Sequence, residues 1–489
     1  MSIDPGRPIP LYFQLKTLLL EDLLGGRYGP GDRLPTEHEL CETFGISRTP
    51  VSRALSELAD EGVVLRHRGR GTFVNPHWAP RGRDRGEIRI VVPQEGPWER
   101  IVRGAAPADL DVNVVAVPRA DLHHMLTHAV ADGLAPDLAV LDSVWVPEFA
   151  AAGFLHGLDE LDQDWVRREH KADFLPPLLG ATLWDGRTFA VSAVADVAGL
   201  WYWRDQLDSR GLDPPRTWSD LLAVGRRFAG DGLPFPIVMP AGSRGGETTA
   251  YCLIALLASN GASVLGERAV SLDSVAAVQA VQFVRQLVDE RLLAQESVGY
   301  DWNRPIRLLG HRQAAISFGG SYEAGTLAHM LGMRVHDLAD EVGFVAVPAG
   351  PMGFPASVTG TMVYGIFRQA ADPKQAMRLL EHVVAPDALA RVAQAPGRIP
   401  PRRSAIALAA AASPFVAMTA EILEHAVTRP ATPVYPRVSA QLAAMLEAVL
   451  TDRLTAPAAV RRTAEMVGAI TGLPVLHDLG ATPRAAPIG

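Results

Sequence analysis

The sequence has little of four features, and each shortage argues against a class of protein. It holds two cysteines, Cys41 and Cys252, so we expect neither a disulfide framework nor a metal site built on cysteine. No apolar run approaches the roughly 18–20 residues that a membrane span needs, so no membrane partner is expected. Lysine occurs only three times, which leaves few candidates for an enzyme that uses a Schiff-base lysine. The chain begins Met-Ser-Ile-Asp-Pro, without a charged lead and an apolar core, and we therefore expect no secretory signal and a cytoplasmic protein.

The remaining composition is typical of a globular protein with several domains. The 489 residues suggest roughly three folding units. The net charge is −8, but it is unevenly distributed: residues 63–85 carry six arginines and one acid, whereas residues 1–62 carry six basic and ten acidic residues. A short positive segment in an acidic chain is where we expect a phosphate backbone to bind.

A helix is predicted just after residue 36, because a capping box stands there. Thr36 is followed three residues later by Glu39, so each side chain can accept from the other residue's amide. Leu40 and Phe44 fall on one face, and Gly45 stands where a left-handed residue ends a helix. The pattern predicts about two helical turns and then a short turn.

A second helix is predicted from Ser47, which we expect to cap it, with Pro50 tolerated in the first turn. Apolar residues with helical spacing predict its buried face: Val51, Ala54, Leu55 and Leu58. Arginine and hydroxyl side chains remain on the opposite face: Arg48, Thr49, Ser52, Arg53 and Ser56. Arginine can bind guanine through two hydrogen bonds and hydroxyls can reach bases or phosphates, so this face suits the major groove of DNA. A surface helix with solvated arginines is the alternative.

A β-hairpin is predicted after Gly62, with strands over residues 63–67 and 72–74 and a glycine-rich turn between them. The hairpin carries Arg66, Arg68 and Arg70 and no acid. A basic hairpin beside such a helix typically touches phosphate or enters the minor groove.

Residues 10–74 resemble the winged helix-turn-helix domain of the GntR family of bacterial regulators. The resemblance runs without a gap from Pro10-Leu11-Tyr12 through Pro30-Gly31-Asp32-Arg33-Leu34-Pro35 to Gly69-Arg70-Gly71-Thr72-Phe73-Val74. It implies an α+β domain that binds a double-stranded DNA operator. The residues we expect to contact DNA are His38, Arg48, Thr49, Ser52, Arg53, Arg68, Gly69 and Arg70.

Four of these positions, Arg48, Thr49, Arg68 and Gly69, match the family pattern, but two depart from it. His38 and Ser52 stand where the family usually or often has arginine. Arg53, next to Ser52, is the candidate to take over the second contact.

The rest of the chain predicts an α/β fold behind a linker. A first helix is expected over residues 11–24, and residues 77–86 are rich in proline, glycine and arginine, which is typical of a linker. Strands at 88–92, 111–118 and 137–142 alternate with helices at 120–132 and from about 146, which predicts a parallel sheet. Ligands of such sheets bind beyond the carboxyl ends of the strands, here residues 93–98 and 142–145.

Farther along, the pattern predicts shorter elements and then a helical end. We expect a hairpin around Asp185-Gly186, a strand over 195–203 and a helix from Ser219. A mostly helical segment over 241–300, a strand and loop over 314–322, and a strand, loop and strand over 342–368 follow. From Pro373 the chain is predicted to be mostly helical.

Several short motifs in this region resemble the extracellular solute-binding proteins of sugar transporters. They are Ala135-Pro136-Asp137-Leu138-Ala139-Val140-Leu141-Asp142, Gly199-Leu200-Trp201-Tyr202, Gly319-Gly320-Ser321-Tyr322 and Gly397-Arg398-Ile399-Pro400-Pro401-Arg402. The resemblance implies a two-lobed α/β periplasmic-binding-protein-like domain of type II that closes on a ligand. The expected domains are therefore a DNA-binding head at 1–76, a linker at 77–86, a two-lobed sensor at 87–475 and a tail at 476–489.

A sugar ligand needs aromatic rings for its apolar face and carboxylates or amides for its hydroxyls. The expected ligand residues are Glu95, Asp142, Trp145, Asp196, Glu247, Tyr251, Gly320 and Tyr322. Each has a simpler alternative: a tryptophan can belong to the core, and an acid at a strand end can cap the next helix. For Trp201 and Tyr202, inside a strand, we expect the core.

Metal and enzyme chemistry have little support in the sequence. His124 and His128 are spaced four residues apart beside His123, but no companion acid of a zinc motif accompanies them, so a solvated helix face is expected. The loop 242–246 lacks the Gly-Lys-Ser/Thr ending of a nucleotide-binding loop, so a hinge or ligand loop is favoured. We expect no cofactor and no enzymatic activity.

Taken together, these patterns predict a ligand-responsive transcription regulator, as a homodimer that binds two DNA half-sites. Two alternatives stay open. Some GntR regulators of similar length carry an aminotransferase-like domain with pyridoxal phosphate, which needs a Schiff-base lysine, and only Lys171 and Lys374 follow the head. The body could also be a partner-binding scaffold that senses no ligand.

Overall fold

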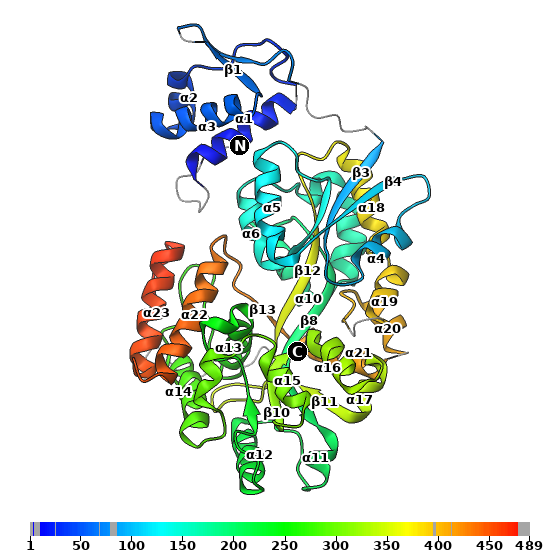
Figure 1. Ribbon diagram of the computed structural model, residues 1–489, viewed down its shortest axis with the longest axis vertical. Helices are drawn as coiled ribbons and strands as arrows, with labels where there is room; N and C mark the ends of the chain where they lie inside the picture. The colour runs from blue at the N-terminus through cyan, green and yellow to red at the C-terminus, as the bar shows by residue number, and fades with distance from the viewer. Residues whose placement is uncertain are drawn as a thin grey trace. The chain divides into compact units, whose positions relative to one another are not determined.

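The fold is taken from a computed structural model, which describes residues 3, 10–24, 26–67, 69–78, 86–394, 398–411 and 413–477. The chain forms two compact units. Unit 1 comprises residues 1–170, 182–191 and 363–388, and unit 2 comprises residues 171–181, 192–362 and 389–489. We call residues 10–78, which belong to unit 1, the head (Figure 1). Most of the predicted linker, and all of the predicted tail beyond residue 477, lies outside the described residues.

The described residues of the head form three helices and one hairpin. They are α1 (Leu11–Leu24), α2 (Glu37–Phe44), α3 (Arg48–Asp60), β1 (Val64–His67) and β2 (Gly71–Val74). The predicted capping box of α2 is confirmed: the Glu39 amide donates to Thr36 Oγ1 over 3.2 Å, and the Thr36 amide donates to Glu39 Oε2 over 2.7 Å. Gly45 ends α2 at a φ of 64°, as predicted. Ser47 takes the N-cap position of α3, but its side chain makes no capping hydrogen bond, so that part of the prediction is wrong.

The apolar stripe of α3 forms the centre of the head's core. Its four predicted residues are fully buried: Val51, Ala54, Leu55 and Leu58. They pack with Leu15 and Leu20 of α1, which are also fully buried. β1 and β2 pair antiparallel, with His67 opposite Gly71, and so form the predicted hairpin. Burial of this stripe turns the arginine and hydroxyl face of α3 outward.

The sheet of unit 1 is parallel, as predicted. β4 (Asp111–Val117), β3 (Glu87–Pro93) and β5 (Leu138–Asp142) stand in that order, and β3 pairs parallel with both neighbours. Figure 1 shows α5 (Arg119–Ala131) and α6 (Val146–Ala151) on one side of β3, with α4 (Trp98–Ala105) and α18 (Pro373–Val383) on the other. The carboxyl ends of β3 and β5 therefore lead into residues 94–97 and 143–145.

Shorter elements complete unit 1. They are η1 (Ser143–Trp145), α7 (Leu158–Leu161), α8 (Gln163–Trp165), the π-helix η2 (Val166–His170) and the predicted hairpin of β6 (Leu183–Trp184) and β7 (Arg187–Thr188). Two long strands carry the chain between the units. β8 (Val191–Trp203) enters unit 2 after its first residue, and β12 (Val358–Ile366) enters unit 1 at Val363.

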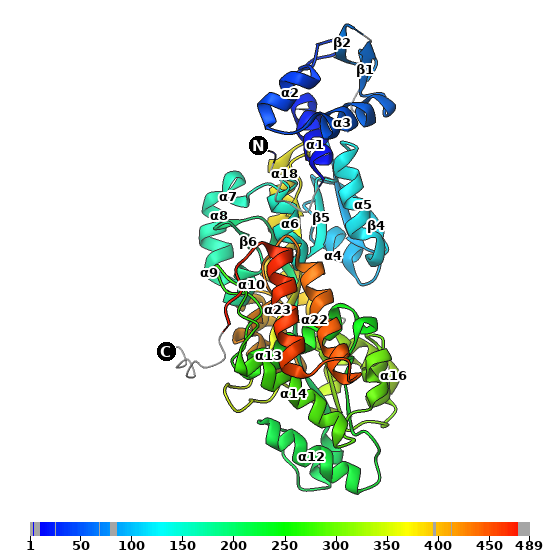
Figure 2. The same ribbon diagram turned by 90° about the vertical axis from the view of Figure 1, so that its left-hand side faces the viewer.

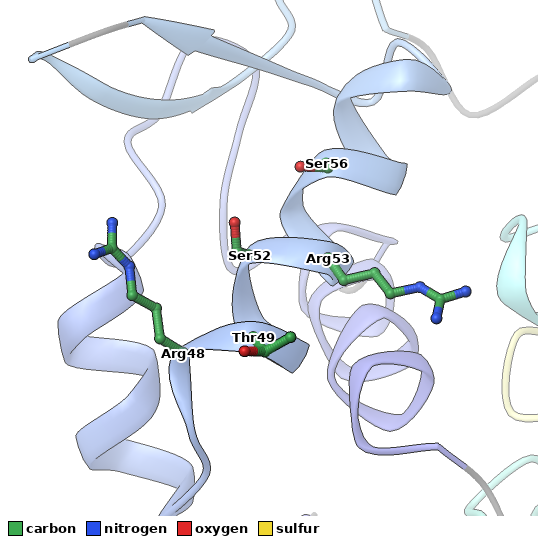
Figure 3. A pocket seen from close by; sticks show the side chains of 5 residues that line it. All are labelled: Arg48, Thr49, Ser52, Arg53 and Ser56. Carbon is green, nitrogen blue, oxygen red and sulfur yellow. The ribbon is translucent and has the colours of Figure 1, made fainter.

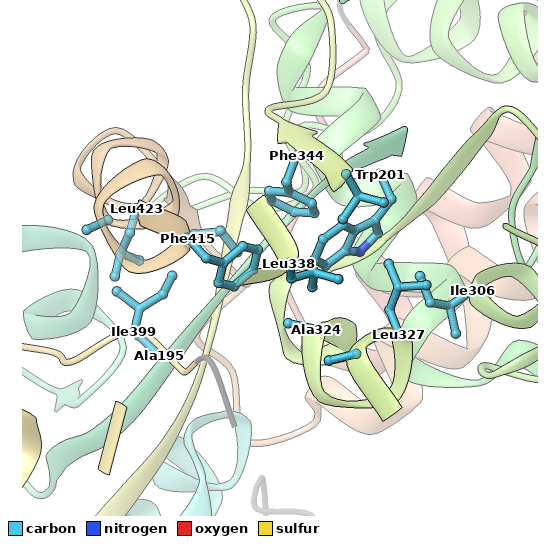
Figure 4. Close-up of a cluster of buried hydrophobic side chains, with 14 of the residues drawn as sticks. Ala195, Trp201, Ile306, Ala324, Leu327, Leu338, Phe344, Ile399, Phe415 and Leu423 are labelled. Carbon is cyan, nitrogen blue, oxygen red and sulfur yellow. The ribbon is translucent and has the colours of Figure 1, made fainter. Parts of the chain in front are cut away.

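Unit 2 is built on β8. β10 (Ile316–Gly320) and β11 (Val342–Val345) pair antiparallel with β8, and β9 (Ile237–Val238) pairs parallel with β10. The unpredicted short strand β13 (Val427–Thr428) pairs with β12. Trp201 lies in the core with no exposed surface, 4.7 Å from the ring centre of Phe344 and stacked on Phe415 (Figure 4). Trp201 and Tyr202 are therefore core residues, as predicted.

Helices surround this sheet. They are α9 (Lys171–Asp173), α10 (Pro176–Gly180), α11 (Arg204–Asp208), α12 (Trp218–Gly230), η3 (Ser243–Gly245), α13 (Glu247–Ser259), α14 (Val275–Asp289), η4 (Gln295–Gly299), α15 (Arg304–Gly310), η5 (Ser321–Glu323), α16 (Ala324–Leu331), η6 (Val335–Asp337), α17 (Leu338–Glu341), α20 (Arg403–Ala410), α21 (Pro414–Glu424), α22 (Tyr435–Leu450) and α23 (Ala456–Thr471), while α19 (Pro386–Gln394) spans the unit boundary. Figures 1 and 2 show α22 and α23 side by side. The predicted helical segment 241–300 is interrupted more than expected, because residues 260–274 form no helix.

Candidate DNA-binding and solute-binding sites

The exposed face of α3 forms an open hollow of about 450 Å³. Its lining is the set that the sequence placed opposite the buried stripe: Arg48, Thr49, Ser52, Arg53 and Ser56 (Figure 3). The first two turns of α3 supply most of these side chains. A helix that exposes arginine and hydroxyl groups at its N-terminal end has the donors needed to read base edges.

Arg48 lies at the N-terminal end of this face and is strongly exposed. Its side chain is 82% accessible, and its Nε donates to Glu37 Oε2 over 2.7 Å. The bond to Arg48 lowers the pKa of the Glu37 carboxyl below its ordinary value, although partial burial works in the opposite direction. Glu37 therefore stays ionised and keeps Arg48 in place.

Arg53 extends to the opposite side of α3 from Arg48 (Figure 3). Its guanidinium carbon lies 3.7 Å from the ring centre of Tyr12 in α1, and its Nε donates to Glu57 over 3.1 Å. The structure thus brings Arg48, Thr49 and Ser52 together and directs Arg53 toward α1. A DNA contact by Arg53 stays a prediction, and one that requires Arg53 to leave Tyr12.

The hairpin places Arg66 beside α3. Arg66 donates from Nη1 to Ser56 Oγ over 2.7 Å and from Nη2 to Glu37 Oε1 over 2.5 Å. Gly69 has a φ of 76°, which explains glycine in the turn, and Arg70 is exposed. Arg68 lies outside the described residues. His38 is 83% exposed on α2, with Nε2 at 3.4 Å from Glu42.

In unit 1, Arg119 connects two of the predicted ligand residues. Its backbone amide donates to Glu95 Oε2 over 2.9 Å, and its Nη2 donates to Asp142 Oδ2 over 3.3 Å. Asp142 Oδ1 also accepts from the Val144 amide over 3.3 Å. Asp142 thus has the helix-capping role that the sequence left open, and its second oxygen points to Arg119.

Trp145 follows at the end of η1 and is partly buried. Its ring and that of His123 meet edge to face, with the ring centres 5.1 Å apart. His123 Nε2 lies 2.9 Å from Glu148 Oε2, so His123 contacts both Trp145 and Glu148. The Trp145 ring is therefore held in place from one side at the carboxyl end of β5.

In unit 2, Asp196 of β8 is held by one arginine. Arg398 Nη1 donates to both carboxylate oxygens, over 2.7 and 2.5 Å. The backbone brings Arg398 close to Asp196, because their neighbours Ile399 and Ala195 exchange hydrogen bonds of 2.9 and 3.1 Å. Asp196 is 8% exposed, and its charge is already compensated.

Tyr251 and Tyr322 lie close together over Gly320. Their ring centres are 6.3 Å apart, and a Cβ on Gly320 would lie 2.3 Å from Tyr322 and 3.3 Å from Tyr251. The Tyr322 hydroxyl lies 3.3 Å from Thr248 Oγ1, whereas the buried Tyr251 hydroxyl has no hydrogen-bond partner among the described residues. Burial raises the pKa of both phenols, so both are neutral donors at neutral pH.

Glu247 begins α13 and serves as an anchor within unit 2. Its carboxylate accepts from Arg429 Nη1 over 2.9 Å, from the Tyr435 hydroxyl over 2.7 Å and from Ser439 Oγ over 2.5 Å. These three donors occupy most of the acceptor sites of the Glu247 carboxylate. A structural role of Glu247 is therefore better supported than a contact with a ligand.

Two parts of the chain match the models of known protein families. Residues 104–390 match the model described as bacterial extracellular solute-binding protein, and residues 11–74 match the model described as bacterial regulatory proteins, gntR family. The first match covers more than half of the chain. The chain belongs to the bacterial extracellular solute-binding protein family. It is a fusion, with a GntR-family helix-turn-helix domain at its N-terminus.

Individual relatives divide in the same way. The GntR-family domain is 45% identical over 75 residues to the HTH-type transcriptional repressor NagR of Bacillus subtilis, covering 15% of this chain and 31% of that protein. The solute-binding domain is 24% identical over 329 residues to a putative binding protein of Brucella abortus, covering 65% of this chain and 76% of that protein. The chain thus spans about 30% of the length of the curated regulators that it matches.

The solute-binding fold is shared with solved structures. A solute-binding protein of Thermotoga lettingae, bound with alpha-D-tagatose, aligns with a TM-score of 0.68 at 22% identity. The alignment covers 79% of this chain and 100% of that one. The larger part of this chain therefore has the two-lobed fold of such proteins.

Both matched families are regulatory or solute-binding rather than enzymatic. In the solute-binding domain, Lys171 and Lys374 are both exposed, whereas a Schiff-base lysine is activated by burial or by a charged neighbour. Over the described residues, no group of three histidine, cysteine, aspartate or glutamate side chains has the geometry of a metal site. No helix within the described ranges is long and apolar enough to cross a membrane.

Sequence reasoning missed several residues of these sites. The partners of the predicted acids are arginines: Arg119, Arg398 and Arg429. The contacts of Glu37 were also not predicted, because the capping-box pattern involves only its neighbours Thr36 and Glu39. Arg398 stands in a motif that the sequence singled out, so it had a signal. Arg429 had none, since it lies 182 residues from Glu247.

Proposed function

We propose that the protein is a DNA-binding transcription regulator that senses a small solute, and that the solute is a carbohydrate. The observation that carries the proposal is the fusion itself: a GntR-family domain and a solute-binding domain share one chain. A domain that closes on a ligand is useful to a regulator only if closure changes how the head binds DNA. The ligand would therefore act by favouring one of two conformations.

The chemistry of the candidate residues supports a carbohydrate. Trp145 offers a partly buried aromatic ring, and Tyr251 and Tyr322 offer neutral hydroxyl donors. Two of the candidate acids form ion pairs with arginine: Asp142 with Arg119 in unit 1, and Asp196 with Arg398 in unit 2. A polyhydroxylated, uncharged ligand suits aromatic rings and paired charges, because it can exchange hydrogen bonds without leaving a buried charge alone. The related Thermotoga lettingae protein is bound with a sugar.

The proposal includes the organisation of the molecule. We assign the head to residues 1–76, the linker to 77–86, the sensor to 87–475 and the tail to 476–489. The protein would act in the cytoplasm, where its operator DNA is, and as a homodimer, because two heads on two half-sites match the symmetry of such operators. Sedimentation of the protein with and without DNA tests the dimer, and a monomer in both states would contradict it.

A thermal-shift screen against sugars tests the sensing role. D-tagatose, maltose and other neutral sugars would be compared with amino acids and sugar phosphates. A ligand at 100 times its dissociation constant should stabilise the protein by about 2.7 kcal/mol. If only an amino acid stabilises the protein, the ligand is an amino acid and not a carbohydrate. If none of the compounds stabilises it, the alternative of a scaffold that senses no ligand is favoured.

A further inference from the structure

Glu37 is the first residue of α2, and its carboxylate joins the two parts of the head that we expect to touch DNA. Oε2 accepts from Arg48 Nε of α3 over 2.7 Å, and Oε1 accepts from Arg66 Nη2 of the hairpin over 2.5 Å. The Glu37 side chain is only 18% exposed. Each oxygen thus holds a different arginine, although neither arginine is near Glu37 in the sequence.

The bond to Arg48 leaves the outer edge of its guanidinium group available. Arg48 binds Glu37 through Nε, and its side chain makes no other hydrogen bond among the described residues. A guanidinium group reads guanine with two parallel N–H groups, one to O6 and one to N7. With Nε bound to Glu37, the two Nη atoms form the edge that can do this. A carboxylate behind the group also fixes its plane, which lowers the entropy lost when the base is bound.

The bond to Arg66 fixes the hairpin relative to α3. Arg66 also donates to Ser56 Oγ of α3 over 2.7 Å, so a single guanidinium group connects β1 to both α2 and α3. The carboxylate stays charged in this setting, because the hydrogen bond from Arg48 lowers the pKa of Glu37. An ionised carboxylate between two arginines also repels phosphate, and so opposes binding that ignores sequence.

We propose that Glu37 is a positioning residue that sets the base specificity of the head. It presents the Nη edge of Arg48 to one base pair, and it keeps Arg48 and Arg66 from pairing with phosphates at random. This inference rests on the proposed function as a DNA-binding regulator. The selectivity of Arg48 would thus depend on a neighbouring carboxylate that itself repels phosphate.

The substitution Glu37→Gln tests the inference, because glutamine has the same shape without the charge. Glutamine keeps only one acceptor oxygen and has no charge, so it cannot hold both Arg48 and Arg66. Affinity for the preferred duplex should therefore change little, while affinity for unrelated DNA rises. We expect the ratio of the two affinities to fall about tenfold, the effect of 1.4 kcal/mol at 25 °C. The dependence of binding on salt should also become steeper, because more arginine charge reaches phosphate.

The matched control is Asp60→Asn at the end of α3. It removes the same charge from the head, and the exposed Asp60 side chain makes no hydrogen bond or ion pair in the part of the chain that the structure describes. The full-length wild-type protein would first select duplexes from a pool with a random central region. Affinities for a selected duplex and for its scrambled version would then be measured for all variants at several salt concentrations.

A base-resolved profile separates positioning from a general loss of structure. Selection with Glu37→Gln should relax the preference at the same base pair as selection with Arg48→Ala, and adding Glu37→Gln to Arg48→Ala should relax it no further. An unchanged affinity ratio, a fall equal to that of Asp60→Asn, or relaxation at a different base pair would overturn the inference. Failure of the wild-type protein to enrich any duplex would instead overturn the proposed function, and the inference with it.

Discussion

At the scale of single residues, the sequence predicted side chains whose partners are close along the chain. The Thr36–Glu39 capping box is an example, because its geometry is set within one helical turn. The pair of Asp196 and Arg398 could not be predicted in this way, since the bond joins positions 202 residues apart. The lists of DNA and ligand contacts stay predictions.

Arg48→Ala should weaken binding to the preferred operator by about 1–3 kcal/mol and relax the preference at one base pair. The reason is that Arg48 is exposed on the hollow of α3 with its Nη edge available. Arg70→Ala, in the exposed turn of the hairpin, should instead weaken binding to all sequences alike and flatten the salt dependence. Equal losses of Arg48→Ala on preferred and scrambled duplexes would contradict the base-reading role.

Glu323→Gln should change how the stability of the sensor depends on pH. Burial raises the pKa of Glu323 from 4.5 to about 8, against donation to Oε2 by the Gly320 amide over 3.0 Å and by Trp201 Nε1 over 3.2 Å. The folded state therefore keeps a proton that the unfolded chain releases. Stability should fall as pH rises from about 5 to about 8, by at most about 1.4 kcal/mol per pH unit from this group.

The measurement for Glu323 is urea unfolding of the wild-type protein and of Glu323→Gln at several pH values. Glutamine cannot titrate, so the variant should lack this component of the slope. An identical slope in the two proteins across this range would show that Glu323 is ionised in the folded state.

At the scale of secondary-structure elements, periodicity worked where an element has one clearly apolar face. The helix over residues 11–24 and the hairpin of the head appear as predicted, because their patterns are long or bounded by glycine. Periodicity failed over residues 260–274, where apolar residues occur without helix. It also missed β13, two exposed residues that form a strand only by pairing with β12. In both places the structure depends on pairing with segments far away in the sequence, which a local pattern does not contain.

Glu247→Gln should loosen the attachment of α13 to α22. Arg429, with a side chain only 7% exposed, would lose its ion pair with Glu247, and the Tyr435 and Ser439 hydroxyls would lose this ionised acceptor. We expect a loss of about 2–3 kcal/mol in the free energy of unfolding. Denaturant unfolding measures it, with the exposed Glu267→Gln as control. Equal stability of the two variants would show that Glu247 anchors nothing.

At the scale of the whole molecule, the sequence was sufficient to recognise both families and the fold of each. Their motifs are local, and they occur in the correct order along the chain. The boundaries of the domains and the tail stay predictions, as does the homodimer. How ligand closure would act on the head could not be derived from sequence, because it depends on two conformations of one chain. That coupling is the central claim.

The most direct measurement of this claim is a titration of a selected duplex with the full-length protein, with and without a saturating sugar from the thermal-shift screen. Coupling energies of about 1–3 kcal/mol are typical of allosteric proteins, so we predict that the dissociation constant for DNA changes between about 5-fold and 150-fold. By reciprocity, the affinity for the sugar should change by the same factor when DNA is bound. An unchanged dissociation constant for DNA at full occupancy of the sensor would contradict the account.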